Sequence, residues 1–187
     1  MDRSRSEFSL LNRHFDDLSA SMKGTGRPSM TEVLCEIAYG AVGISTLRGQ
    51  PVRNRPDRCN RFVVYPPAES VPIQLQLLEA SIAAPATRAR SFDAVVSLVA
   101  LTNCHPFLDG NGRVARIVAN RLLDRTASAA RVYLPLREIA IFSRGGYILR
   151  VREAELQGNW LPLAYFLLAA VEFWALQIGA EPLSSPQ

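Results

Sequence analysis

The stretch from His105 to Arg116, HPFLDGNGRVAR, concentrates groups that can bind an anion or move a proton. Its histidine is the one titratable side chain there that is suited to proton transfer near neutral pH. Gly110 and Gly112 lack a Cβ atom, so the backbone can curl and bring its N–H groups close to a ligand. At the start of a following helix, such N–H groups and the helix dipole favour an anion. The stretch therefore predicts an anion site beside a base.

Two arginines and one carboxylate indicate which anion would bind. Arg113 and Arg116 are three residues apart on the expected helix, so they project from neighbouring positions and suit several phosphate groups. Asp109 would repel phosphate unless a divalent cation lay between them, which favours Mg²⁺. Taken singly, DGNG is typical of a turn, and a histidine before proline is typical of a structural residue. Their combination in one segment favours a phosphate site.

The spacing of apolar residues predicts that helices position this stretch. The capping box Ser29-Met30-Thr31-Glu32 predicts a helix over about 30–47. Apolar spacing predicts further helices that begin near Pro72 and Ser91, and others that cover about 113–124, 144–157 and 162–178.

A different pattern separates the first two of these helices. Five arginines lie between residues 48 and 61 among Pro, Asn and Asp, and the last of them opens the strand-like RFVVY. This pattern predicts an extended hairpin or flap over about 48–65, with a solvated loop as the alternative. The fold class expected is mainly α with one small β-hairpin.

Length and composition suit one soluble domain of 187 residues, with 48% hydrophobic and 20% charged residues and a formal net charge of +4. Lys23 is the only lysine, and the other basic residues are arginines. A GC-rich genome explains this preference for arginine as well as phosphate binding does. The three cysteines form no CxxC pair, which indicates free thiols in a reducing compartment.

Neither end of the sequence predicts a membrane partner. The N-terminus has no apolar stretch typical of a signal peptide, so a cytoplasmic protein is expected, while export as an effector stays open. Residues 161–179 are nearly all apolar, but they are short for a span and include Glu172, which favours a core helix. The expected organisation is an N-terminal arm or short helix (1–28), one domain (29–180) and a flexible tail (181–187).

Residues 105–116 resemble the signature of the Fic family, HPFx(D/E)GNGRxxR, at all nine specified positions. The resemblance extends to about residues 45–178. LRGQPVRNR is similar to the start of the family's flap, RFVVYPPAESVPIQLQLLEASI to its return and the next helix, and YILRVREAELQGNWLPLAYFLL to the closing helices. It implies a helical Fic bundle with a β-hairpin flap and an enzyme, a protein adenylyltransferase. Such an enzyme moves AMP from ATP to a hydroxyl of a target protein and releases pyrophosphate.

The resemblance also implies roles for the individual polar residues of the motif. It implies that His105 is the general base and that Asp109 is the ligand of a Mg²⁺ bridging the α- and β-phosphates. Asn111 would contact the α-phosphate, and the backbone of Gly110 and Gly112 would form the anion hole. Arg113 would contact the β-phosphate side and Arg116 the γ-phosphate. The flap, about residues 52–65, would bind the target backbone as an added strand. The closing helices would supply the adenine pocket, with Tyr147 as the candidate residue.

Two alternatives stay open at this point. Some Fic-like proteins transfer phosphate, UMP or phosphocholine, but the phosphate-transferring branch departs from the consensus at the acidic and glycine positions. This chain keeps Asp109, Gly110 and Arg116, which favours AMP. The second alternative is a non-catalytic nucleotide-binding or nucleic-acid-binding module that uses the arginines of residues 48–61. An intact base and metal ligand serve no purpose in such a module, which argues against nucleic acid.

Many Fic proteins carry an inhibitory helix, (S/T)xxxE(G/N), whose glutamate pairs with the second arginine of the motif. Among the 17 acidic residues of this sequence, only Asp109 is followed by Gly or Asn, and Asp109 belongs to the motif itself. The resemblance therefore implies an enzyme that is either constitutively active or restrained by a separate small protein near Arg116. The second arrangement is that of a bacterial toxin–antitoxin pair.

Overall fold

The computed structural model of the chain describes residues 28–54, 59–60, 62–83, 90–124, 134–143 and 145–177. The predicted N-terminal arm, apart from its last residue, and the predicted C-terminal tail lie outside these residues. The described part is mainly helical, as expected, and the chain divides into two compact units, residues 1–132 and 133–187.

The first helix of unit 1, α3 (Met30–Val42), begins at the predicted capping box. The Glu32 N–H donates to Ser29 Oγ over 3.3 Å, and the Ser29 N–H donates to Glu32 Oε2 over 2.6 Å. The helix ends at Gly43, whose φ of 76° is the left-handed conformation common after a helix C-terminus. The predicted helix to residue 47 was thus too long, because Gly43 caps the helix at Val42.

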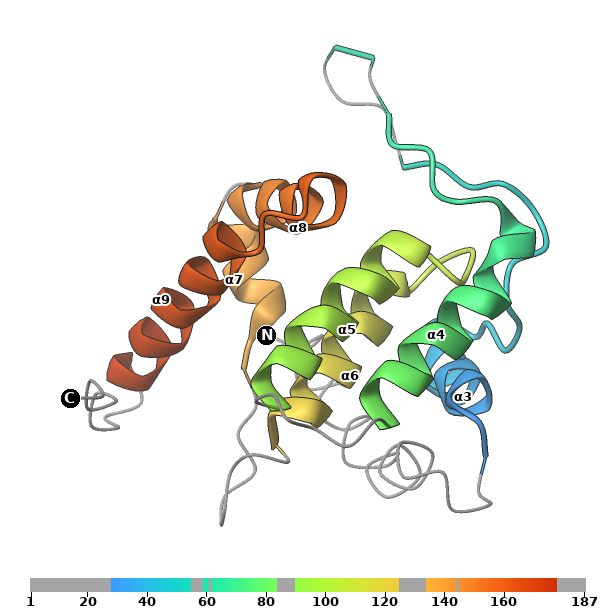
Figure 1. The fold of residues 1–187 in the computed structure, drawn as a ribbon, viewed down its shortest axis with the longest axis horizontal. Helices are drawn as coiled ribbons and strands as arrows, with labels where there is room; N and C mark the ends of the chain where they lie inside the picture. The colour runs from blue at the N-terminus through green and yellow to red at the C-terminus, as the bar shows by residue number, and fades with distance from the viewer. Residues whose placement is uncertain are drawn as a thin grey trace. The chain divides into compact units, whose positions relative to one another are not determined.

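Three longer helices complete unit 1: α4 (Val71–Ala83), preceded by the short 3-10 helix η1 (Ala68–Ser70), α5 (Arg90–Cys104) and α6 (Asn111–Asp124). In Figure 1, α5 and α6 lie side by side, and they share the most extensive contact in the described fold. Helix α4 packs on α3 and α5, and α3 packs on α6. Because α5 and α6 are consecutive, residues 105–110 between them are held at one end of this helix pair.

The flap differs from its prediction, because the described residues contain no β-strand. Its two arms run as extended segments that leave the helices together (Figure 1), joined by one isolated antiparallel bridge between Arg53 and Val64. Beside the bridge, the Tyr65 N–H donates to Val52 O over 3.2 Å. Near the bridge, Pro51 lies on the outgoing arm and Pro66 on the returning arm, and a proline lacks the N–H that a longer ladder needs. A two-stranded ribbon without a third strand is also marginal in water.

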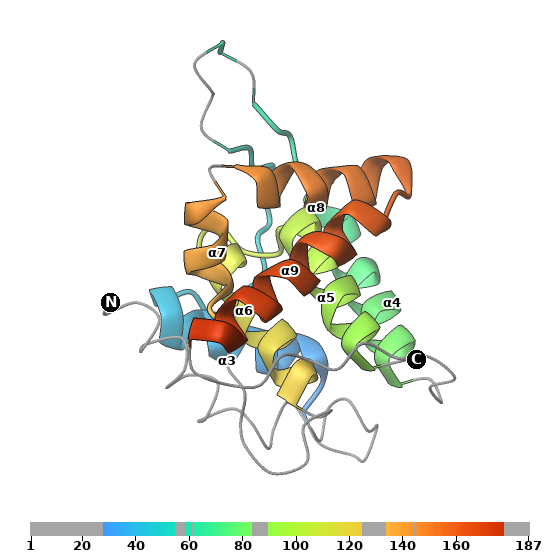
Figure 2. The same cartoon turned by 90° about the vertical axis from the view of Figure 1, so that its left-hand side faces the viewer.

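Unit 2 contains α7 (Leu136–Phe142), α8 (Gly146–Gln157) and α9 (Leu161–Gln177). The sequence pattern did not predict α7, which is only seven residues long. Helices α8 and α9 pack together (Figure 2), yet α9 is not the buried core helix that was expected. Leu163 is fully buried, while Tyr165 and Phe173 remain 67% and 62% exposed. None of the described helices combines the length and the apolar content needed to cross a membrane.

Candidate active site

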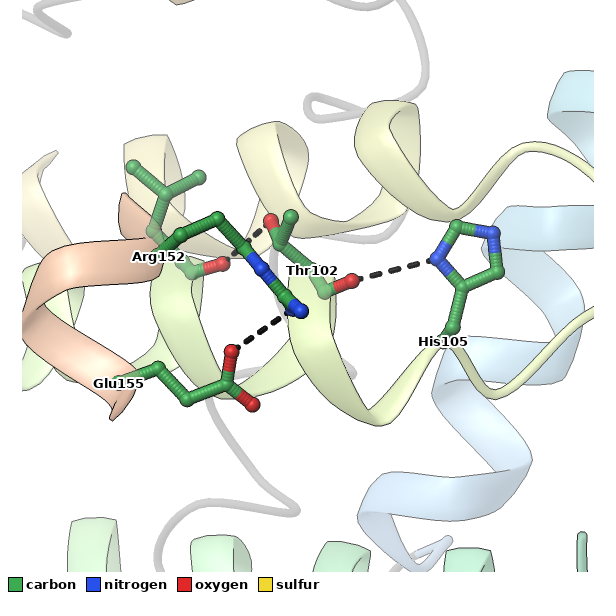
Figure 3. A network of polar contacts seen from close by, with 5 residues as sticks. Thr102, His105, Arg152 and Glu155 are labelled. Carbon is green, nitrogen blue, oxygen red and sulfur yellow. Dashed lines mark hydrogen bonds and ion pairs between the residues drawn. The ribbon is translucent and has the colours of Figure 1, made fainter. Parts of the chain in front are cut away.

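His105 follows the last residue of α5 and adopts an uncommon backbone conformation, with a φ of 51°. Its imidazole Nδ1 lies 3.2 Å from Thr102 O, the contact drawn in Figure 3. A carbonyl oxygen can only accept, so this contact requires the proton on Nδ1 and leaves the Nε2 lone pair available. The geometry therefore presents the side chain as a base.

Burial lowers the pKa of His105 below its ordinary value of 6.5, and the positive charge of Arg48 acts in the same direction. The bond to Thr102 and the charge of Asp109 oppose this shift without cancelling it. The imidazole is consequently neutral at pH 7, as a base must be. The neighbouring Cys104 is no rival nucleophile, because burial raises the pKa of its thiol to about 11.

Tyr65, from the returning arm of the flap, stacks on the imidazole of His105. The two ring centroids are 3.7 Å apart and the ring planes differ by 19°. The flap is thus in direct contact with His105, the candidate base. No local signal in the sequence marks Tyr65 for this role, because the contact joins residues forty positions apart.

The loop between the base and α6 is held by two buried side chains. Phe107 is fully buried and anchors the loop in the core of unit 1. Asn111 clamps the backbone of the same residue: its Oδ1 accepts from the Phe107 N–H, and its Nδ2 donates to Phe107 O, both over 2.8 Å. Asn111 therefore shapes the loop in this structure. Its contact with an α-phosphate stays a prediction.

The start of α6 supplies unpaired backbone donors. Gly110 has a φ of 81°, and its carbonyl accepts from the N–H groups of Arg113 and Val114. The N–H groups of Asn111 and Gly112 have no acceptor within the part of the chain that the structure describes. Donors of this kind at a helix N-terminus suit an anion.

The two arginines of the motif point in different directions. A Cβ atom added to Gly112 would lie 3.3 Å from Arg116 Nη1, so that guanidinium lies beside the first turn of α6. Arg113 instead donates through Nη1 to Ala41 O, near the end of α3. The structure thus brings Arg116 to the anion-binding donors and engages Arg113 with a neighbouring helix.

Asp109 is the one carboxylate of the loop, and it is exposed. Its Oδ1 accepts from the Gly110 N–H over 2.6 Å. No group of three or more His, Cys, Asp or Glu side chains able to hold a metal occurs in the described ranges. A cation at Asp109 would need phosphate oxygens and water as its other ligands, which is the way Mg²⁺ binds with nucleotides. The residues present therefore fit a Mg²⁺ that arrives with a nucleotide.

Tyr147, the predicted adenine-binding residue, lies in α8 of unit 2. It is only 4% exposed, and its ring packs at 6.3 Å and 40° against Phe166 of α9. In this position the ring belongs to the core of its own unit and leaves little surface for a purine. Its role in adenine binding stays a prediction.

The chain is similar to solved Fic structures over nearly its whole length. A Fic family protein from Desulfovibrio desulfuricans superposes with a TM-score of 0.75 at 19% identity, covering 98% of this chain and 55% of that one. Fic-1 from C. elegans gives 0.64 at 19% identity, covering 95% of this chain and 51% of that one. BepC of Bartonella tribocorum, a VirB-translocated effector protein with bound AMPPNP, gives 0.50 at 15% identity, covering 84% of each chain.

The chain spans about half the length of the Desulfovibrio and C. elegans proteins. No curated protein sequence matches it. The sequence profile of the Fic/DOC family matches residues 31–123, the segment that contains nearly all of α3, the flap, His105 and the loop before α6. On this match and on the shared fold, the chain belongs to the Fic/DOC family.

Proposed function

We propose that this protein transfers AMP from ATP to a hydroxyl group of a target protein. Fic-family proteins are typically transferases that move nucleotide monophosphate groups onto proteins. The observation that carries the proposal is a neutral His105, held through Nδ1 by Thr102, one short loop away from the donors and Arg116 at the start of α6. ATP as the co-substrate is further supported by the AMPPNP bound to the Bartonella relative.

In the proposed reaction, the oxygen of the target hydroxyl attacks the α-phosphorus of ATP. A new oxygen–phosphorus bond forms, the bond from the α-phosphorus to the bridging oxygen breaks, and pyrophosphate leaves. His105 Nε2 takes the proton of the attacking hydroxyl. The N–H groups at the start of α6, together with Arg116, stabilise the negative charge that builds on the phosphates.

Asp109 would hold Mg²⁺ against the phosphates of the nucleotide. The ion supplies charge neutralisation for the leaving pyrophosphate. The single exposed carboxylate of the loop suits this shared coordination, because the nucleotide provides the other oxygen ligands. The rest of the rate enhancement comes from positioning, as in other phosphate transfers.

The flap is the proposed docking surface for the target. Its arms are extended, and Phe62 and Val64 on the returning arm are 44% and 64% exposed. An extended target segment can pair with such an arm through its backbone, which leaves the choice of target side chain broad. The stacked Tyr65 then places the docked segment next to His105.

A separate protein is the proposed source of restraint, because the sequence contains no (S/T)xxxE(G/N) motif. An acidic side chain of such a partner would approach Arg116 and compete with the γ-phosphate. The purified chain is then expected to transfer label without any activating step. Activity that rises when a segment of the chain itself is deleted would contradict this proposal.

The function is tested by incubating the chain with a cell lysate and ATP labelled at the α-phosphate. His105→Ala is expected to lower the rate of label transfer by about 10²–10⁴-fold, because it removes the general base. His14→Ala replaces the other histidine of the chain and is expected to leave the rate unchanged. Transfer from γ-labelled ATP or from labelled UTP in place of α-labelled ATP would overturn the proposal, as would full activity of His105→Ala.

A further inference from the structure

Arg48 lies at the base of the flap and is almost completely buried, with 4% of its surface exposed. The sequence pattern placed it with the arginines of a polar hairpin or flap outside the core. Among the described residues, no carboxylate pairs with it, and all the partners of its guanidinium are backbone carbonyl groups. A cation buried in this way is costly unless its donors are well satisfied, so the arrangement calls for a specific explanation.

One set of Arg48 bonds holds the peptide groups around the base. Its Nε donates to His105 O over 2.7 Å, and its Nη2 donates to Cys104 O over 3.2 Å. Its own backbone N–H donates to Pro106 O over 2.9 Å. One residue thus binds three successive carbonyl groups where α5 ends, a place where carbonyls lack helical partners and the helix dipole favours a cation.

The other set of bonds holds both arms of the flap. Arg48 Nη1 donates to Gln50 O over 3.1 Å, on the outgoing arm. Its Nη2 donates to Pro66 O over 2.6 Å, on the returning arm. Pro66 directly follows Tyr65, the residue whose ring stacks on the imidazole of His105. The guanidinium therefore connects the backbone of His105 to the carbonyl of Pro66, the residue next to the stacked Tyr65.

We propose that Arg48 is a positioning residue, which locks the backbone of His105 and both flap arms into one frame and so fixes the imidazole against Tyr65. This inference rests on the proposed function, in which His105 is the general base. Arg48 touches no reacting atom. It acts by fixing where the base and the docked target lie relative to each other.

The chemistry of arginine suits this task. His105 is held at a φ of 51°, a left-handed conformation that is unfavourable for a residue with a Cβ atom and needs surrounding contacts to maintain it. The planar guanidinium directs rigid donors to carbonyls on different sides, and its charge strengthens each bond. A lysine offers its three donors from one nitrogen atom and cannot reach the same set of carbonyls.

The test begins with the imidazole itself, by NMR of protein labelled in its histidines. The chain has only two histidines, so His105→Gln assigns the two signals. Stacking on an aromatic ring shifts the imidazole protons of His105 upfield in the wild type. This signature does not require the enzyme to be active. A wild-type chain that transferred no label would therefore overturn the proposed function while the NMR result still decided on Arg48.

Two variants and one control separate positioning from general stability. Arg48→Met keeps the volume of the aliphatic stem and removes the donors, whereas Arg48→Lys keeps the charge. Arg137→Met makes the same change at an arginine of α7 in unit 2, which pairs with Glu138 at 3.5 Å and has no part in the proposed reaction. Circular dichroism of each variant establishes that it is folded before kinetics are measured.

In Arg48→Met, the upfield shift of His105 is expected to disappear and kcat to fall by about 10²-fold, the effect of displacing a catalytic group by roughly 1 Å. ATP affinity is expected to stay unchanged, because no bond described for Arg48 reaches residues 109–113. Arg48→Lys is expected to show the same pattern, and Arg137→Met to match the wild type.

Several results would overturn the inference. One is a folded Arg48→Met protein with wild-type kcat and an unmoved His105 signal. Another is an Arg48→Met protein with a lower kcat but an unmoved His105 signal. A third is weaker ATP binding with an unchanged kcat. Neither of these outcomes involves displacement of the imidazole. Loss of the fold in both Arg48→Met and Arg48→Lys would show a general stabilising role instead of a positioning one.

Discussion

A single imidazole carries the proposed chemistry, and three kinds of contact determine its state. Thr102 fixes the tautomer, Tyr65 covers one face of the ring, and Arg48 holds the backbone. Burial and the charge of Arg48 then keep the ring neutral. Each contact comes from a different segment of unit 1, so the base depends on the tertiary fold more than on the motif alone.

The lowered pKa of His105 predicts the pH dependence of transfer. As a base, the imidazole is active when neutral, so the rate should fall only as the pH drops below 6.5, through the lowered pKa. The measurement is kcat/KM between pH 4.5 and pH 8, about two units below the ordinary histidine pKa and more than one above it. An acidic limb with its midpoint above 6.5 would contradict the assignment.

The same shift links His105 to stability. Its pKa is lower in the folded chain than in the unfolded chain, so the unfolded chain binds a proton more readily as the pH falls below 6.5. This group therefore reduces the free energy of unfolding as the pH falls through that window, and has no such effect above it. In His105→Gln, the free energy of unfolding should therefore decrease less steeply than in the wild type as the pH falls below 6.5.

At the scale of elements, the end of α3 supports the anion-binding loop. Val42 packs where a side chain at Gly110 would lie, and Ala41 O accepts a bond from Arg113. The close approach of α3 is possible only because Gly110 has no Cβ atom. The first glycine of the motif thus has a packing role in addition to its backbone conformation.

Gly110→Ala is expected to cost more stability than the same change at Gly43. Both glycines have a positive φ, 81° and 76°, which strains alanine by about 1–2 kcal/mol. The new Cβ at position 110 would also lie 2.8 Å from Val42 Cγ2, whereas at position 43 it would meet nothing within 4 Å. Overpacking should add roughly 1–3 kcal/mol at Gly110, measured as the free energy of unfolding in urea.

The double variant Gly110→Ala/Val42→Ala isolates the steric part. It should lose less stability than the sum of the two single changes, because removing the valine methyl groups relieves the contact. Equal losses for Gly110→Ala and Gly43→Ala, or strict additivity in the double variant, would show that α3 does not constrain the loop.

At the scale of the whole molecule, the described residues provide one exposed carboxylate at the site and no cluster of metal-binding side chains. A single carboxylate such as Asp109 does not hold Mg²⁺ tightly without further oxygen ligands. The cation and the nucleotide should therefore bind together, each completing the site of the other.

Calorimetry can check this expectation directly. Mg²⁺ titrated into the chain alone should give no measurable binding. In the transfer assay, EDTA should abolish label transfer from ATP. Asp109→Asn should raise the Mg²⁺ concentration that is needed for the half-maximal rate of transfer. Asn111, whose side chain is committed to the Phe107 backbone, is unsuited as a substitute ligand. Full activity in EDTA would leave Asp109 as a turn residue.

Local patterns predicted most of the helices. The capping box placed the start of α3, and apolar spacing located α4, α5, α6, α8 and α9 to within a few residues. The short α7 was missed, because seven residues are too few for a periodic signal. The prediction of a β-hairpin was also wrong, because the two arms are joined by one isolated bridge and their described residues form no strands. Neighbouring segments in the fold, and not local propensity, decide whether extended arms form a ladder.

The sequence by itself determined the family, the helical class and the candidate base, because nine matching positions within twelve residues specify one loop and one helix start. Only the tertiary structure decided where side chains with distant partners point. Arg48 turned inward from an apparently solvated segment, Tyr65 came to rest on His105, and Arg113 reached α3. The contacts of Arg48 and Tyr65 with His105, and that of Arg113 with Ala41, join residues 40 to 72 positions apart in the chain. Their free energies depend on burial and on carbonyl groups that α5, α3 and the flap expose only once they have packed.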